Sequence, residues 1–165
     1  MATDFQGLLA ALTDHKVDFV VIGGVALIVQ GSARTTTDLD ICYSRQPENI
    51  GRLADALAPQ KPTLRGAPPD LPFRWDARTL ANGLNFTLET DLGWIDLLGE
   101  VTGLGGYDAV SAAARSMELY GRRALVLGLE GLERAKKAAG RVKDLTDLAE
   151  IREIRRRTGD RSGGV

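Results

Sequence analysis

The sequence predicts an α+β fold, in which a small, mixed and twisted β-sheet has flanking helices and is followed by a C-terminal helical segment. Three observations predict it. Residues 19–22 are apolar, the run breaks at Gly23-Gly24, and an apolar segment of helical length follows, which is typical of a strand, a tight turn and a helix. Charged and apolar residues alternate over 34–41, as they do on a half-buried strand. A similar pattern within 85–98 predicts two further strands joined by a turn.

The remaining elements follow from the same periodicities. Apolar residues at helical spacing predict an amphipathic helix over 4–16 and a second helix over 47–58, which opens with a proline. Five prolines between residues 59 and 72 exclude a continuous helix and predict a connector. Towards the C-terminus we expect a flexible glycine-rich loop over 99–107, a hairpin over 117–127 and helices over 128–158.

The length of 165 residues predicts one domain, with a sheet-containing core over 1–127, C-terminal helices over 128–158 and a flexible tail over 159–165. Hydrophobic residues make up 44% and charged residues 26%, as in an ordinary soluble globular protein. No apolar run approaches the ~20 residues needed to cross a bilayer and no secretory segment is seen, so we expect a cytoplasmic protein without a membrane partner. The single cysteine, Cys42, excludes an intrachain disulfide.

Two carboxylates on one strand face are the first candidate functional residues. With a strand period of two, Asp38 and Asp40 point to the same side, where they repel each other unless a cation or a proton lies between them. A hard divalent metal, Mg²⁺ or Mn²⁺, is the usual partner of such oxygen donors. Asp96 lies within an otherwise apolar strand and also needs a partner, because burying an unpaired acid costs several kcal/mol.

The Gly-Gly turn complements these acids. Gly23 and Gly24 lack Cβ atoms, so a phosphate can approach the backbone while the N–H groups of the following helix point at it. Together, the turn and the acids predict a site for a nucleoside triphosphate and its metal.

These residues carry a resemblance to a known family. The ordered pattern resembles that of the nucleotidyltransferase superfamily, which includes DNA polymerase beta, at Gly23, Gly24, Arg34, Thr36, Asp38 and Asp40. The resemblance implies the nucleotidyltransferase fold, and it implies that Asp96 is the third carboxylate of the metal site. Many members carry a serine where this chain has Gly24, so a hydroxyl directed at phosphate is either missing or supplied by Ser32.

A second motif, over residues 129–148, resembles stand-alone bacterial nucleotidyltransferases, including the AbiE-type abortive-infection toxins and the MenT-type tRNA-modifying toxins. Its lysine aligns with Lys136, with Lys137 as an alternative, and its later positions align with Arg141, Lys143-Asp144 and Asp147. A lysine at the start of a helix can reach triphosphate oxygens, and acids one helical turn further on can orient basic side chains. A surface helix with many salt bridges is the alternative explanation of these charges.

The resemblance implies transfer of an NMP from an NTP such as ATP to an acceptor hydroxyl, with release of pyrophosphate. It implies that Asp38 and Asp40 hold the metal, and that Asp96 completes the site for a second metal or acts as a base. Arg34 and Lys136 then neutralise charge on the leaving pyrophosphate. The implied catalytic residues are Asp38, Asp40, Asp96 and Lys136, and the implied nucleotide-binding residues are Gly23, Gly24, Ser32, Arg34, Thr36, Arg141 and Asp144.

The sequence leaves the acceptor open among RNA such as tRNA, a protein hydroxyl and a small molecule. One interpretation is the toxin of a toxin–antitoxin-like system, with a cognate antitoxin as partner. The alternative function is a non-catalytic nucleotide-binding or regulatory module of the same fold.

Two further groups leave alternatives open. Phe73 and Trp75 either anchor the proline-rich connector to the core or cover a nucleotide together with Arg74. The basic residues near the C-terminus, Arg152, Arg155 to Arg157 and Arg161, either end a helix favourably for its dipole or follow the phosphates of a nucleic-acid substrate.

Overall fold

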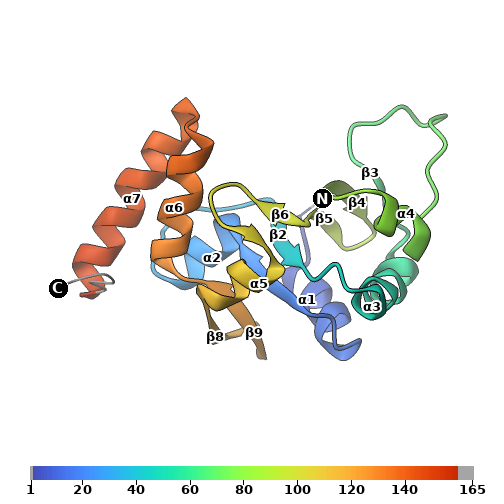
Figure 1. Cartoon of the computed structure of the whole chain (residues 1–165), viewed down its shortest axis with the longest axis horizontal. Coiled ribbons are helices and arrows are strands. Elements are labelled where there is room, and N and C mark those ends of the chain that lie inside the picture. Colours follow the sequence, from blue (N-terminus) through green and yellow to red (C-terminus); the bar gives the residue numbers. More distant parts are fainter. Residues whose placement is uncertain (1, 160–165) are drawn as a thin grey trace.

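The computed structural model describes residues 2–159 and is built around a mixed, seven-stranded β-sheet (Figure 1). Its strands are β1 (Phe19–Ile22), β2 (Asp38–Tyr43), β3 (Thr63–Leu64), β4 (Phe86–Thr90), β5 (Gly93–Leu98), β8 (Ala114–Leu119) and β9 (Arg122–Leu127). They lie in the order β3-β4-β5-β2-β1-β9-β8. β1 is parallel to β9 and β2 is parallel to β5, whereas the other neighbours are antiparallel. This arrangement confirms the predicted mixed sheet.

Helices flank the sheet, as predicted, and two of them form the C-terminal segment (Figure 1). They are α1 (Phe5–Asp14), α2 (Gly23–Val29), α3 (Pro47–Leu57), α4 (Ala77–Asn82), α5 (Tyr107–Ala112), α6 (Leu129–Ala139) and α7 (Val142–Thr158), with a 3₁₀ turn η1 (Ala58–Gln60). Asp4 caps α1 by accepting a hydrogen bond from the Gly7 N–H, and Pro47 opens α3. None of the helices within 2–159 has the length and apolar composition needed to cross a bilayer.

The apolar core surrounds the central strands and determines which way β2 faces. All four residues of β1 are buried, because β1 is a central strand between β2 and β9 and is also contacted by the helices α2 and α5. Along β2 the side chains alternate, so Leu39 and Ile41 are buried while Asp38 and Asp40 keep partial exposure. The burial of Leu39 and Ile41 therefore fixes the two acids on the opposite face.

The proline-rich connector is anchored to the core by its aromatic residues. Phe73 and Trp75 pack against core residues, and the Trp75 indole N–H donates to the Ala54 carbonyl at 2.9 Å. Arg74 is 89% exposed and pairs with Asp76. Of the two alternatives for these aromatics, anchoring is the one that the structure supports.

Two predicted boundaries were wrong. The strand predicted from residue 34 begins only at Asp38, because the segment before it turns towards α7. The predicted flexible loop over 99–107 contains a short hairpin, β6 (Glu100–Val101) and β7 (Gly105–Gly106), followed by the start of α5. Gly103 in its turn has φ +87°, and an added Cβ would lie 2.5 Å from the Ala138 Cβ, so the hairpin packs closely on α6.

The C-terminal helices α6 and α7 pack against each other at one end of the molecule (Figure 1). Gly140 ends α6 in the left-handed conformation, and the Asp144 side chain accepts from the Arg141 N–H to begin α7. Lys136 lies in the last turn of α6 rather than at a helix start, which corrects the predicted placement. Apart from Gly159, the predicted tail over 159–165 lies outside the described residues.

Candidate functional site

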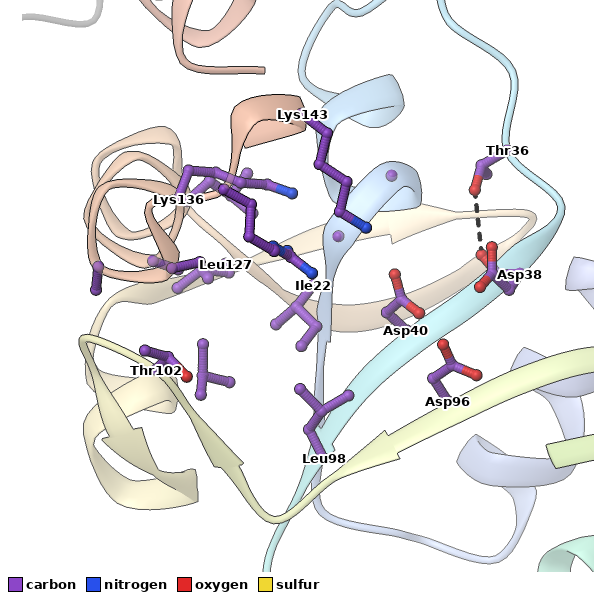
Figure 2. Close-up of a pocket in the computed structure, with 18 of the residues that line it drawn as sticks. Ile22, Thr36, Asp38, Asp40, Asp96, Leu98, Thr102, Leu127, Lys136 and Lys143 are labelled. Carbon is purple, nitrogen blue, oxygen red and sulfur yellow. Dashed lines mark hydrogen bonds between the residues drawn. The ribbon is translucent and has the colours of Figure 1, made fainter. Parts of the chain in front are cut away.

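A cavity of about 730 Å³ lies between the central strands and the C-terminal helices (Figure 2). Its sheet side carries acids, and its helix side carries basic residues from α6 and the start of α7, namely Lys136, Arg141 and Lys143. Between these two sides the lining is apolar and includes Leu98, Leu127 and Leu132. The cavity therefore combines an acidic site with cationic and apolar walls.

Parallel pairing of β2 with β5 brings three carboxyl groups together. Asp40 lies directly opposite Asp96 in the register, and Asp38 is two residues earlier on the same face. One oxygen from each of the three carboxylates lies within 4.8 Å of the others. Figure 2 shows the three side chains converging at the edge of the cavity.

Crowding and burial change the protonation of these acids. Burial raises the pKa of Asp40 to about 8, and the charges of Asp38 and Asp96 add to the effect. Burial also raises the pKa of Asp96, against the lowering effect of Arg65. The cluster is thus poorly neutralised by the protein alone, and its donors are all carboxylate oxygens. This donor set fits a hard divalent cation such as Mg²⁺ or Mn²⁺.

The two glycines make room for the side chains of the site. An added Cβ at Gly23 would lie 2.1 Å from Asp40 Oδ2, and Gly23 also has φ +66°. An added Cβ at Gly24 would lie 2.8 Å from Thr36 Oγ1. Both glycines and Thr36 line the cavity, and the Thr36 hydroxyl donates to the Asp38 carbonyl at 3.4 Å (Figure 2). The Gly-Gly turn thus allows the acid strand to approach the start of α2.

Arg34 and Lys136 reach the cavity from different elements and are joined by one acid of α7. Arg34 Nη2 lies 2.5 Å from Asp147 Oδ1, and Lys136 Nζ lies 2.8 Å from Asp147 Oδ2. Arg34 Nε also contacts Glu150 at 3.2 Å. Burial works to raise the pKa of Asp147, but its hydrogen bonds with Lys136 and Arg34 outweigh this effect and lower it. Asp147 therefore stays ionised and holds both cations in place.

Two predicted site residues lie behind the cavity wall. The Ser32 hydroxyl donates to Glu150 of α7 at 2.6 Å and does not line the cavity, so the hydroxyl that we expected to meet phosphate is directed at an acid instead. The Asp144 side chain is 1% exposed and lies beneath Lys136 and Arg141. The hydrogen bond from Arg141 is the main cause that lowers the pKa of Asp144, to about 2. Ser32 and Asp144 therefore support the site from behind.

The structure distinguishes the two candidate lysines. Lys136 lines the cavity, whereas Lys137 does not and instead pairs with Glu133 at 3.5 Å. The basic run is also engaged within the helices: Arg152 and Arg155 contact Glu133, and Arg156 and Arg157 contact Glu153. For these four arginines, the ion pairs favour the helix-end explanation over a phosphate-binding patch, and Arg161 lies outside the described residues.

Sequence reasoning missed two cations at the site. Arg65, in the proline-rich connector, lies 2.7 Å from Asp96 Oδ1 and 3.8 Å from Asp38 Oδ2. Lys143 lines the cavity, and Figure 2 shows it extending from the start of α7 towards the acids. Lys143 was aligned with the second motif, so that alignment could have identified it. No local pattern marks Arg65.

Comparisons with known proteins give the fold. No protein-family model matches the chain, and no curated protein matches its sequence. Among solved structures, the lincosamide antibiotic adenylyltransferase LnuA in its lincomycin-bound form is 14% identical with a TM-score of 0.58, over 93% of this chain and 99% of that one. A proposed nucleotidyltransferase from Thermotoga maritima, TM1012, is 19% identical with a TM-score of 0.56, over 87% and 86% of the two chains. The chain therefore has the fold found in nucleotidyltransferases, as its sequence predicts.

Proposed function

We propose that the protein is a metal-dependent nucleotidyltransferase, which transfers an NMP from an NTP to an acceptor hydroxyl. The observation that carries this proposal is the cluster of Asp38, Asp40 and Asp96 at the edge of a cavity whose other side is cationic. Carboxylates that hold a divalent cation and cations that meet phosphate are the two requirements for binding a metal–triphosphate. The fold that the chain shares with nucleotidyltransferases supports the same chemistry.

The transfer forms a bond between the acceptor oxygen and the α-phosphorus and breaks the bond between the α-phosphorus and the bridging oxygen. The pyrophosphate leaves with that electron pair, and the acceptor hydroxyl gives its proton to a carboxylate of the cluster. Lys136, Lys143 and Arg34 lie on the cavity wall opposite the acids, where they neutralise the charge that develops on pyrophosphate. Gly23 and Gly24 give the phosphates access to the backbone beside the acids.

Asp38 and Asp40 are the residues that hold the metal in this proposal, and Asp96 completes the cluster. A bound Mg²⁺ or Mn²⁺ supplies charge neutralisation at the triphosphate. The raised pKa of Asp40 is consistent with a carboxyl group that gives up its proton when a cation binds.

The acceptor is proposed to be a hydroxyl of tRNA or another RNA, of a protein, or of a small molecule. LnuA is an adenylyltransferase for lincosamide antibiotics, and its structure contains lincomycin, which is the observation that favours a small molecule. The resemblance of residues 129–148 to toxin nucleotidyltransferases favours RNA or protein instead, and with it an antitoxin partner. Both classes belong in the first assay.

The test is incubation of the purified protein with each α-³²P-labelled NTP and Mg²⁺, together with total tRNA, a protein extract or a panel of lincosamides and aminoglycosides. Labelled acceptor is expected with the wild type. Asp40→Asn should reduce the label by at least about 1000-fold, because a bound metal supplies several kcal/mol of charge stabilisation. Full transfer by Asp40→Asn would refute the assignment. Nucleotide binding without label on any acceptor would favour the non-catalytic binding module.

A further inference from the structure

Arg65 is fixed against the acid cluster on the side of β3. Its backbone N–H donates to the Thr87 carbonyl at 3.0 Å, and its guanidinium Nη1 donates to the Leu88 carbonyl at 3.4 Å. The guanidinium carbon lies 4.7 Å from the centre of the Trp94 ring. With Asp96 at 2.7 Å, these contacts hold an arginine side chain that is only 18% exposed.

This placement puts a permanent positive charge where a second metal ion would need its ligands. Asp96 Oδ1 already accepts a charge-assisted hydrogen bond from Arg65, and Asp38 Oδ2 lies 3.8 Å from the same nitrogen. A further cation at these oxygens would find fewer free donor atoms and would be repelled by the guanidinium charge. Within residues 2–159, Arg65 forms ion pairs with Asp38 and Asp96 but not with Asp40, so the Asp38–Asp40 side remains open to a cation.

The charge balance of the cluster also indicates a single metal ion. Three carboxylates carry three negative charges when ionised, and Arg65 neutralises one of them. The two that remain equal the charge of a single divalent cation. Before the nucleotide arrives, one metal ion therefore neutralises the cluster, and a second would make it positive.

We propose that Arg65 takes the place of a second metal ion, so that the site binds one divalent cation through Asp38 and Asp40. Arg65 is then a positioning residue, which holds Asp96 through Oδ1, so that Asp96 accepts a hydrogen bond from the acceptor hydroxyl instead of holding a second metal ion. This inference rests on the proposed function and decides between the two roles that the sequence left open for Asp96.

The test counts bound metal in the full chain by native mass spectrometry, with Mn²⁺ alone and with Mn²⁺ and α,β-methylene-ATP. We expect one Mn²⁺ per wild-type chain in both conditions. Arg65→Gln removes the guanidinium charge and should admit a second Mn²⁺, whereas Arg65→Lys keeps a cation and should retain one. Arg74→Gln, an exposed change in the same connector, is the matched control and should also retain one.

The possible outcomes separate the two proposals. Two Mn²⁺ ions on the wild type would overturn the role of Arg65 and leave the transferase proposal intact. This result needs no variant, so it would hold even if Arg65→Gln failed to fold. A single Mn²⁺ on both the wild type and a folded Arg65→Gln would also overturn it. Absence of any bound Mn²⁺ on the wild type in both conditions would instead count against the metal site of the proposed function.

Discussion

Replacing Asp40 with asparagine should stabilise the protein when no divalent metal is present. Burial and the neighbouring acids raise the pKa of Asp40 to about 8 in the folded protein, whereas the pKa in the unfolded chain is about 3.9. Below pH 4 the carboxyl group is protonated in both states and does not change the free energy of unfolding. As the pH rises from about 4 to about 8 the unfolded chain releases this proton more readily, so the folded state loses stability, and the loss levels off above pH 8. Asparagine removes that loss.

The magnitude follows from the size of the shift. One pKa unit corresponds to about 1.4 kcal/mol, so a difference of about four units sets a ceiling of about 5 to 6 kcal/mol. Water in the cavity and relaxation of the carboxylates reduce this value. We therefore expect Asp40→Asn to raise the free energy of unfolding by about 2 kcal/mol at pH 8. For a chain of this length, that increase corresponds to a rise in Tm of about 4 to 8 °C.

The assay is thermal unfolding followed by circular dichroism in the presence of EDTA, from pH 4 to pH 8. The Tm advantage of Asp40→Asn should grow with pH and vanish at pH 4. Added Mg²⁺ should then raise the Tm of the wild type at pH 8 but not that of the variant. Asp55→Asn, at an exposed position on α3, is the control and should leave the profile unchanged. A variant that is less stable than the wild type at pH 8 in EDTA would refute the reasoning.

Three further changes test other parts of the site. Lys143→Ala should raise the KM for NTP about 10-fold with little change in Tm, because Lys143 extends into the cavity. Lys137→Ala is the control and should leave the KM unchanged, because Lys137 pairs with Glu133 outside the cavity. Equal effects of the two changes on KM would contradict the role of Lys143. Gly23→Ala should lose about 1 to 2 kcal/mol of stability and weaken Mn²⁺ binding at least about 10-fold, because its Cβ would displace Asp40. Gly121 has the same kind of positive φ but free space around it. Gly121→Ala should therefore lower the stability, as measured by unfolding, and leave Mn²⁺ binding unchanged, as measured by titration. The pKa of Asp144 is lowered to about 2, so its stabilising contribution is present above about pH 4 and is lost as the pH falls towards 2. The Tm difference between the wild type and Asp144→Asn should accordingly be constant from pH 8 to pH 5 and shrink below pH 4.

The sheet and its acids could be predicted because their signals are local. Strand alternation places Asp38 and Asp40 on one face, and the buried Leu39 and Ile41 leave them no other orientation. The same two-residue period in β5 predicts the face on which Asp96 lies, and the parallel register then brings Asp96 opposite Asp40. Here local periodicity and tertiary pairing lead to the same arrangement.

The partners of these residues could not be predicted, because they depend on how distant elements pack. Arg65 reaches Asp96 through β3, a strand of two residues that pairs with β4 within a proline-rich connector. Ser32 was assigned to phosphate from the resemblance, but its hydroxyl is bound by Glu150, 118 residues later in the chain. Neither contact has a spacing that a sequence pattern can indicate.

The ion pairs of Arg34 and Lys136 do not prevent these cations from meeting a triphosphate. A guanidinium has five N–H donors, and Arg34 uses two of them for Asp147 and Glu150 among the described residues. An ammonium has three donors, and Lys136 forms two ion pairs, with Asp147 at 2.8 Å and with Asp144 at 3.4 Å, which leave at least one donor available. Both cations therefore retain donors for phosphate while α7 holds them in position, which lowers the conformational cost of binding. In the proposed function, the acids of α7 thus hold the cationic wall in position for a nucleotide, and the sheet provides the carboxylates that face it.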